Sequence, residues 1–410
     1  MQRLISLRAA VFLAIVVGLV AYLAGAHTGS VVRPSVATAQ APIKWKVQSA
    51  WPPTSIVQDA AKLLVDTINK TSGGRLQMEL SPAGAIVPPF EIQDAVNRGV
   101  LDAGHTTPGY IIGKLKAFIP LTHGPLVGMD FIDYYGWYWE GGGHELLQEA
   151  YQDKLKMNVV SFQVHPEGPQ AMGWFKKEIR SFKDIKGSRY RIYAAGAEVY
   201  NKLGIASVVL AGGEIVPALE RGAIDGAEWI NCYDDKILGL DKVAKFHYAP
   251  GMHEPTTVGE FIINKGKWDA LPADLKEVVK TSVQASYWNH FVRFHEKTAK
   301  ACQELLAAGI KIIKTTDELN KGFLKAYDEI WQADAAKDEF YRKVIDSQKK
   351  YSSLIVPYRM SYWPKYDFIG EHYYKEKIWL SDKPAAKPAA APVAAPAAAK
   401  PAEKKAPEKK

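Results

Sequence analysis

The sequence predicts an α/β protein with two lobes, a ligand cleft between them, and one long helix that spans both. Three observations support this prediction. At 410 residues the chain is too long for a single hydrophobic core. Its first half alternates short strands with helices, which is typical of a parallel sheet covered by helices. A helical pattern from Asp274 to about Ala308 would extend for about 50 Å, which exceeds one small domain.

The first lobe is expected to combine residues 43–165 with residues from about 257 to 296. Lys44–Ala50 alternates polar and apolar residues, as a half-buried strand does. Ser55 can cap the following helix, which continues to about Lys70 and stops at Gly73-Gly74. Further elements are expected as strands at Leu76–Leu80, Leu101–Thr106, Val159–Val164 and Phe261–Asn264, and as helices at Phe90–Asn97 and Asp130–Tyr151.

The second lobe is expected to combine residues 166–256 with residues from about 297 to 380. Tyr190–Tyr193 is expected to be a strand, with Arg191 and Tyr193 on one face. A further strand is expected at Lys311–Lys314 and a helix at Asp317–Gln348. The segment Tyr351–Tyr374 is aromatic-rich and is expected to pack somewhere, without a particular partner.

The net charge of +8 lies at the two ends of the chain. Residues 1–33 carry three arginines and no acidic residue, and residues 383–410 carry seven lysines and two glutamates. Residues 34–382 are therefore formally neutral. The basic balance does not predict a nucleic-acid partner or a membrane surface for the folded body.

Both ends have recognisable patterns. In residues 1–41, two arginines precede the apolar run Ala9–Ala26, and Ala37-Thr38-Ala39 resembles a cleavage site, which is typical of an export signal. The apolar run is also at the low end of membrane-spanning length, so an uncleaved N-terminal anchor is the alternative. Either reading exports the body and predicts a periplasmic protein. Residues 383–410, rich in Ala, Pro and Lys, are expected to be a disordered tail.

The two cysteines, Cys232 and Cys302, belong to no CxxC or metal-binding pattern. An oxidising compartment would allow them to pair, but nothing in their sequence context indicates a bond. We therefore expect two unpaired and mostly buried cysteines.

Enzyme signatures are absent from the sequence, which has no GxSxG, no HExxH and no nucleotide-binding fingerprint. Gly141-Gly142-Gly143 lacks the preceding strand and the following Lys-Ser/Thr of a phosphate loop. The adjacent acids Asp234 and Asp235 fit the start of a helix better than an acid–base pair. Only His165 and Tyr110 would remain as general acid or base in a cleft, so binding is favoured over catalysis.

Arg191 is the best binding candidate from the residues themselves. An arginine at the carboxyl end of a strand lies where α/β folds bind ligands, and its planar fork suits a carboxylate. A salt-bridged surface arginine is the competing interpretation. Glu228-Trp229 follows a second strand-like stretch, and a glutamate beside a large aromatic needs either a partner charge or a metal ion.

The stretch Ile179–Asp225 resembles the signature of solute-binding proteins of TRAP (tripartite ATP-independent periplasmic) transporters, of the DctP type. The pattern consists of FKDIKGSRYRI at Phe182–Ile192, Leu203-Gly204-Ile205, and E-x-x-PALERGAIDG from Glu214 to Gly226. The resemblance extends from about Lys44 to about Tyr374. It implies a two-lobed periplasmic-binding-protein-like fold that delivers a solute to membrane permease subunits.

Within that family the chain is most similar to the branch that binds 2-oxoacids and related monocarboxylates through a bridging metal ion. The matching residues are Gln170 before Trp174-Phe175, the pair Gly212-Gly213, Glu228-Trp229, and Tyr233-Asp234-Asp235. The resemblance implies that Arg191 binds the ligand carboxylate. It also implies that Gln170, Glu228 and the backbone carbonyl of Trp229 bind the cation, and that Tyr110 belongs to the substrate site.

The chain departs from the pattern at two places. Asn231-Cys232 stands where Gly-Pro is expected, so Asn231 is predicted to add a polar group to the substrate site. His165-Pro166-Glu167-Gly168 also differs, just before Gln170.

A charge count connects these residues to a cation. Arg191, Glu228 and a monocarboxylate together carry one negative charge, which a sodium ion would neutralise, so sodium is favoured over calcium. The sequence thus predicts a non-enzymatic, exported binding protein for a small organic acid such as a 2-oxoacid or lactate. The alternative is a sensor input protein of the same fold, and the resemblance also allows a homodimer.

Overall fold

The computed structural model describes residues 15–17 and 41–375. The export signal predicted for residues 1–41 falls almost wholly outside the described residues, and the predicted tail at 383–410 falls entirely outside them. Within the described part, no helix combines the length and apolarity needed to cross a bilayer.

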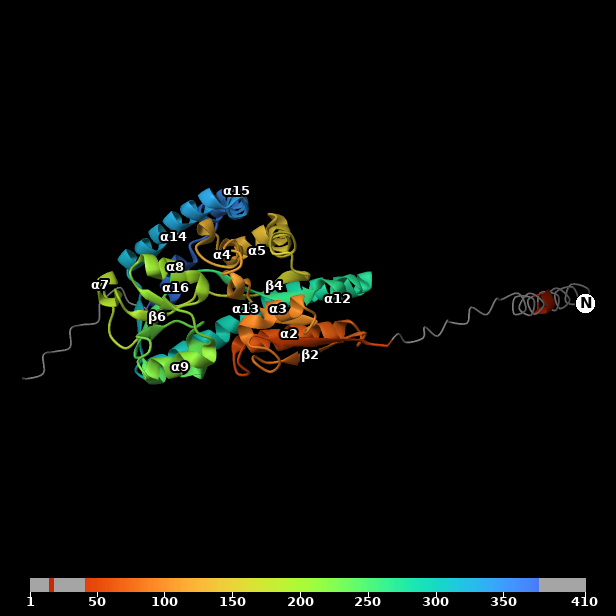
Figure 1. Ribbon diagram of the computed structural model, residues 1–410, viewed down its shortest axis with the longest axis horizontal. Coiled ribbons are helices and arrows are strands. Elements are labelled where there is room, and N and C mark those ends of the chain that lie inside the picture. Colours follow the sequence, from red (N-terminus) through yellow and green to blue (C-terminus); the bar gives the residue numbers. More distant parts are fainter. Residues whose placement is uncertain (1–14, 18–40, 376–410) are drawn as a thin grey trace, which may run out of the picture.

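Two separate sheets organise the molecule (Figure 1). The strands of the first sheet are β1 (Ile43–Ser49), β2 (Leu76–Ser81), β3 (Ala103–Thr106), β4 (Val159–Glu167) and β10 (Thr257–Asn264). Their order is β2-β1-β3-β10-β4. β1 runs parallel to β2 and β3, whereas β10 is antiparallel to both β3 and β4.

The second sheet has six short strands in the order β11-β9-β5-β8-β6-β7. They are β5 (Gly173–Phe175), β6 (Arg189–Arg191), β7 (Ala206–Val208), β8 (Gly226–Ala227), β9 (Phe246–Ala249) and β11 (Lys311–Lys314). β6 is parallel to both β7 and β8, with Arg191 opposite Ala227. The predicted α/β class with two sheets is confirmed, and the exact lobe boundaries stay a prediction.

The helices before β4 begin with α2 (Ile56–Thr71), which Ser55 caps as predicted by accepting the Val57 N–H. The others in this part are α3 (Ile92–Asn97), α4 (Phe118–Thr122), α5 (Phe131–Glu140) and α6 (Gly143–Glu149), with a π-helical turn at Ala150–Lys154 and 3₁₀ turns at Pro89–Glu91, Pro108–Ile111 and Leu126–Gly128.

The later helices lie in both halves of the molecule. They are α7 (Phe182–Ile185), α8 (Ala194–Lys202), α9 (Gly212–Glu220), α10 (Cys232–Leu238), α11 (Leu240–Val243), α12 (Lys265–Asp269), α13 (Ala273–Ala307), α14 (Asp317–Lys337), α15 (Glu339–Tyr362) and α16 (Tyr366–Tyr374). Of these, α12 lies on the first sheet and α15 lies against α4, α5 and α6. The predicted helix at Asp317–Gln348 is interrupted at Asp338, whose side chain caps α15 by accepting the N–H groups of Phe340 and Tyr341.

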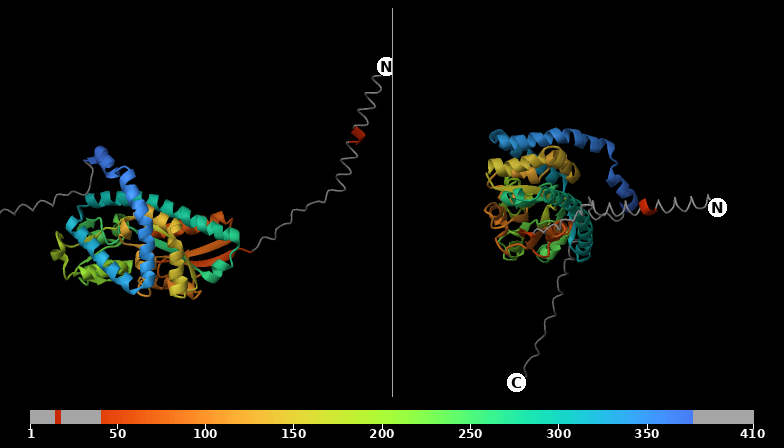
Figure 2. Two further views of the ribbon diagram at one scale, coloured as in Figure 1. Left: turned by 90° about the horizontal axis from the view of Figure 1, so that it is seen from above. Right: turned by 90° about the vertical axis from the view of Figure 1, so that its right-hand side faces the viewer.

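The long helix α13 has 35 residues and runs along the whole body, as Figure 2 shows from above. It packs against α2 and β4 of the first lobe and against α10, next to the second sheet. The prediction of one helix spanning both lobes is therefore confirmed. Its limits agree with the predicted ones because Pro272 precedes it and Gly309 follows it.

One sequence prediction was wrong. Cys232 and Cys302 form a disulfide, because α10 packs on α13 and brings the two Cα atoms to 5.1 Å across a separation of 70 residues. The aromatic-rich C-terminal segment does not pack against the body along its whole length. It continues as α15 and α16 into an arm that projects from the molecule (Figure 2).

Candidate functional site

Arg191 ends β6 and is buried, with 2% of its surface exposed. Its Nη1 donates to the side chain of Glu228 at 2.6 Å and to the Glu228 carbonyl at 2.8 Å, and its Nε donates to the Leu210 carbonyl at 3.1 Å. The guanidinium also lies 5.1 Å from the centre of the Trp229 ring. Nη2 has no hydrogen-bond partner among the described residues, so one edge of the fork is left for a ligand.

Glu228 directly follows β8, and the parallel pairing of β8 with β6 brings it to Arg191. One carboxylate oxygen, Oε1, also accepts the Tyr193 N–H at 2.6 Å. The other, Oε2, is buried and has no partner in the described part of the chain. Burial raises the pKa of Glu228 to about 7, although Arg191 and the Tyr193 N–H lower it.

Gln170 lies between β4 and β5 and has a comparable free atom. Its Nε2 donates to Glu167 Oε2 at 3.1 Å, while its Oε1 is buried without a partner among the described residues. Two of the oxygens without a partner, Gln170 Oε1 and Glu228 Oε2, belong to side chains predicted to hold the cation. A buried oxygen acceptor without a donor is costly, and a hard cation would satisfy it, so these residues fit a metal ion.

Fewer acidic ligands gather here than in many metal centres. Among the described residues, no group of three or more His, Cys, Asp or Glu side chains could hold a metal ion by itself. A cation at this place would thus depend on the amide oxygen of Gln170, on a backbone carbonyl and on the bound acid, in addition to Glu228.

A small cavity of about 30 Å³ lies against these groups. Four aromatic residues, Trp51, Tyr110, Tyr193 and Trp229, contribute to its wall, together with Glu167, Gln170, Arg191 and apolar or hydroxyl side chains such as Thr107, Ile230 and Val258. Residues of both lobes form the wall. The cavity is therefore the part of the predicted cleft that stays open when the two lobes are in contact.

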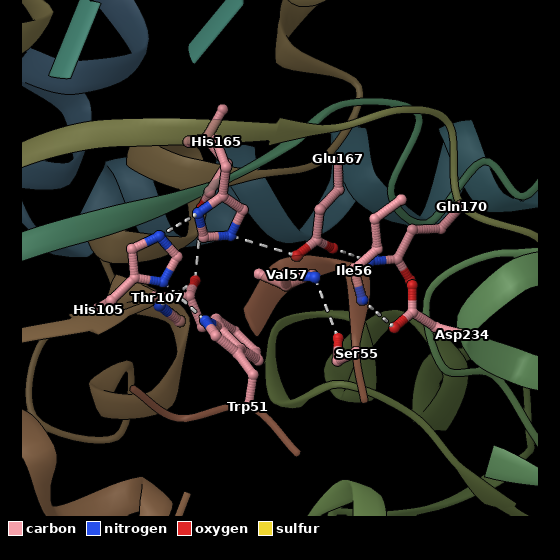
Figure 3. A network of polar contacts seen from close by, with 12 residues as sticks. Trp51, Ser55, Ile56, Val57, His105, Thr107, His165, Glu167, Gln170 and Asp234 are labelled. Carbon is pink, nitrogen blue, oxygen red and sulfur yellow. Dashed lines mark hydrogen bonds and ion pairs between the residues drawn. The ribbon is translucent and has the colours of Figure 1, made fainter. Parts of the chain in front are cut away.

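Two contacts join the lobes beside this cavity. The Tyr193 hydroxyl lies 2.8 Å from Thr107 Oγ1, and a Cβ at Gly109 would fall 1.6 Å from that hydroxyl, so glycine is required there. On the other side, Asp234 accepts the Ile56 N–H at the start of α2 at 3.0 Å. Figure 3 shows this contact next to Gln170.

The side chain of Asn231 lies at the start of α10, whereas the sequence prediction placed it in the substrate site. Its Oδ1 caps α10 by accepting the N–H groups of Tyr233 and Asp234, and its Nδ2 lies 3.3 Å from Asp234 Oδ2. Its side chain does not line the cavity. The departure at Asn231-Cys232 therefore builds the start of α10 and its attachment to α13, and a direct contact of Asn231 with a ligand stays a prediction. Asp234 and Asp235 lie in the first turn of α10, as expected.

Two carboxylates at the site were not assigned a role from the sequence. Glu167 lines the cavity, and burial raises its pKa to about 7. Glu254 is fully buried, neither of its oxygens has a partner in the described part, and burial raises its pKa well above the usual range. The only sequence signal was the departure at His165–Gly168. Glu254 has none, because β9 and the turn after it bring it to the site only in the fold.

The fold and site define a two-lobed binding protein with a cleft for a small anion. Residues 47–338 match the DctP family model, described as bacterial extracellular solute-binding protein, family 7. The chain belongs to this family and is a TRAP-type extracytoplasmic solute-binding protein. It is 34% identical over 313 residues to the monocarboxylate 2-oxoacid-binding periplasmic protein of Nostoc sp. (strain PCC 7120), covering 76% of this chain and 85% of that protein.

Solved structures of TRAP solute-binding proteins agree with this assignment. The protein from Bordetella bronchiseptica, a mixed-occupancy dimer with copurified calcium and picolinate, has a TM-score of 0.77 and 27% identity, covering 82% of this chain and 98% of that one. The protein from Pseudoalteromonas atlantica, with sodium and pyruvate, has a TM-score of 0.73 and 28% identity, with 82% and 99% covered. The protein from Colwellia psychrerythraea, with calcium and pyruvate, has a TM-score of 0.74 and 27% identity, with 82% and 100% covered.

Proposed function

We propose that this protein captures a small carboxylate, namely a 2-oxoacid, lactate or a similar monocarboxylate, and delivers it to the membrane permease of a TRAP transporter. The observation that carries the proposal is the buried Arg191–Glu228 pair, in which Arg191 lines a small cavity and one carboxylate oxygen of Glu228 has no partner among the described residues. The export pattern and the family support periplasmic delivery. The protein makes and breaks no bond in this function.

Each predicted residue has a role in this proposal. The ligand carboxylate binds Arg191, and the cation is held by Gln170 Oε1, Glu228 Oε2 and the Trp229 carbonyl. When bound, the cation supplies positive charge between two carboxylates, which at 4 Å would otherwise repel each other by about 4 kcal/mol at an effective dielectric near 20. Tyr110 and the other aromatic residues of the wall exclude water.

The size of the cavity supports a short ligand. Its volume of about 30 Å³ admits only a few water-sized groups. The bulky rings of Trp51, Tyr193 and Trp229 limit the length of a ligand in several directions. We therefore favour acids of about the size of pyruvate over longer 2-oxoacids.

Two further carboxylates near Glu228 affect which cation suits the site. The charge count from the sequence, which used only Arg191 and Glu228, favoured sodium. Glu167 and Glu254 interact electrostatically with Glu228 and add negative charge that this count omitted. The similar structures hold either sodium or calcium with their ligands.

A calorimetric titration tests the function and the cation together. Pyruvate, lactate and C4–C6 2-oxoacids are titrated into protein freed of metal and then supplied with sodium or calcium. We expect binding that weakens with chain length, and Glu228→Gln should weaken it by about tenfold or more, because the variant loses the cation's charge partner. Affinity that is indifferent to chelation and to added sodium would exclude the bridging ion. Absence of binding for every acid would instead favour the sensor alternative or another solute.

The sensor alternative uses the same fold and the same cleft but a different partner. A permease gene beside the gene for this chain supports delivery to a transporter, and a signalling-kinase gene there supports the sensor. An enzymatic role would require turnover of a 2-oxoacid by the purified protein.

The projecting arm supports the homodimer that the resemblance allows. Eight large apolar side chains on α15 and α16 are 51–77% exposed, namely Leu354, Tyr358, Met360, Tyr362, Tyr366, Phe368, Tyr373 and Tyr374. Such an exposed apolar surface is unusual for a monomer, and a second copy of this chain is the occupant we propose. Light scattering should give twice the monomer mass. Serine at Tyr362, Tyr366 and Phe368 should give the monomer mass, and a monomeric wild type would contradict the dimer.

A further inference from the structure

Glu167 lies beside a cation ligand without being one of the predicted ligands. It is the last residue of β4, lines the cavity and is buried. Its Oε2 accepts the Gln170 amide N–H at 3.1 Å. This hydrogen bond sets the orientation of the Gln170 side-chain amide. Because Nε2 must face Glu167, Oε1 must point away from it.

A row of buried aromatic side chains leads from Trp51 to Glu167, as drawn in Figure 3. The Trp51 indole N–H donates to His105 Nδ1 at 2.8 Å. His105 Nε2 lies 3.2 Å from His165 Nδ1, and the two rings are stacked. His165 Nε2 in turn lies 3.5 Å from Glu167 Oε1.

The Trp51 indole sets the direction of the hydrogen bonds along this row of side chains. An indole nitrogen only donates, so His105 Nδ1 must accept and the proton of a neutral His105 is on Nε2. That proton points to His165 Nδ1, which leaves the proton of a neutral His165 on Nε2, facing Glu167. Burial lowers the pKa of both rings, which keeps them neutral. The Trp51 and His105 donors thus point along the row towards His165, whose Nε2 faces Glu167 but makes no hydrogen bond within the described residues.

The room for this arrangement is provided by Gly259 on the adjacent strand β10. A Cβ at that position would lie 1.7 Å from the His165 ring. Glycine at residue 259 therefore allows the imidazole to lie between His105 and Glu167.

Glu167 also changes the charge at the site. Arg191, Glu228, Glu167 and a bound monocarboxylate together carry two negative charges, which a divalent cation neutralises and a sodium ion does not.

From this geometry we propose that Glu167 is a positioning residue that turns Gln170 Oε1 towards the cation, and that its charge makes the site prefer calcium over sodium. The inference rests on the proposed function, since it concerns the same cation. Outer groups that hold metal ligands commonly affect metal affinity by about tenfold to a hundredfold.

Two variants separate the contributions of Glu167. Glu167→Gln keeps an oxygen that accepts the Gln170 N–H but removes the charge, whereas Glu167→Leu removes both. The half-saturating concentrations of calcium chloride and sodium chloride for pyruvate binding are measured by calorimetry, together with calcium binding in the absence of any acid. Glu296→Gln, an exposed site on α13 paired with Lys300, is the matched control for loss of one charge.

The wild type should require less calcium than sodium for half-saturation. We expect Glu167→Gln to reduce this preference by about tenfold, and Glu167→Leu to weaken both cations further, while Glu296→Gln changes neither. A Glu167→Gln protein whose calcium-to-sodium ratio stays within twofold of the wild type would overturn the proposal, even if the leucine variant does not fold. If the wild type binds neither pyruvate nor a cation, the proposed function itself fails, which is a different result.

Discussion

Arg191→Ala is expected to abolish binding of the acid, with a loss of affinity of at least about a hundredfold. The variant removes the charged donor for the ligand carboxylate and leaves Glu228 buried without its partner. Arg191→Lys should recover little, because one ammonium cannot replace the three-sided contact of the guanidinium with Glu228, Leu210 and the ligand. Calorimetry with pyruvate measures both variants.

The matched control is Arg189→Ala, on the same strand. Arg189 is half exposed and pairs with Asp225 at 3.0 Å, away from the cavity. This control should bind pyruvate as the wild type does. Because an unpaired Glu228 also destabilises the fold, circular dichroism must show that Arg191→Ala is folded at the temperature of the titration. A folded Arg191→Ala protein with unchanged affinity would refute the site.

Removal of the Cys232–Cys302 disulfide is expected to lower the free energy of unfolding by about 4 kcal/mol, because the bond closes a loop of 70 residues in the unfolded chain. The midpoint of thermal unfolding should fall by several degrees. The measurement compares the wild type, with and without a reducing agent, to a variant with serine at both positions.

The double serine variant provides its own control, since a reducing agent should not change its midpoint. Equal midpoints for the oxidised wild type and the serine variant would show that packing of α10 on α13 holds the two helices together without the bond.

The parts of the fold that could be predicted depend on local signals. Ser55 caps α2 and Pro272 precedes α13, so both helices begin within a residue or two of their predicted starts. Arg191 was identified because it ends a strand inside a long family signature. In these cases the residues that decide the structure are close together in the sequence.

The parts that could not be predicted depend on contacts between distant segments. The disulfide forms because α10 and α13 pack together. The sequence around Cys232 and Cys302 does not indicate that these helices are in contact. Asn231 looked like a ligand contact because it replaces a family residue, yet its side chain caps a helix. Glu167 and Glu254 could not be assigned to the site from the sequence, because they come close to Arg191 only when β4, β9 and β6 are arranged in the fold.

The position of β10 in the first sheet governs the order in which the chain can fold. β10 lies between β3 and β4 but begins 90 residues after β4 ends. A chain that has emerged only as far as β9 therefore lacks β10, the strand that joins β4 to β3 in the first sheet. The first sheet is therefore completed only after residues 168–256, which carry five of the six strands of the second sheet, have emerged, and its completion depends on contacts between distant parts of the chain.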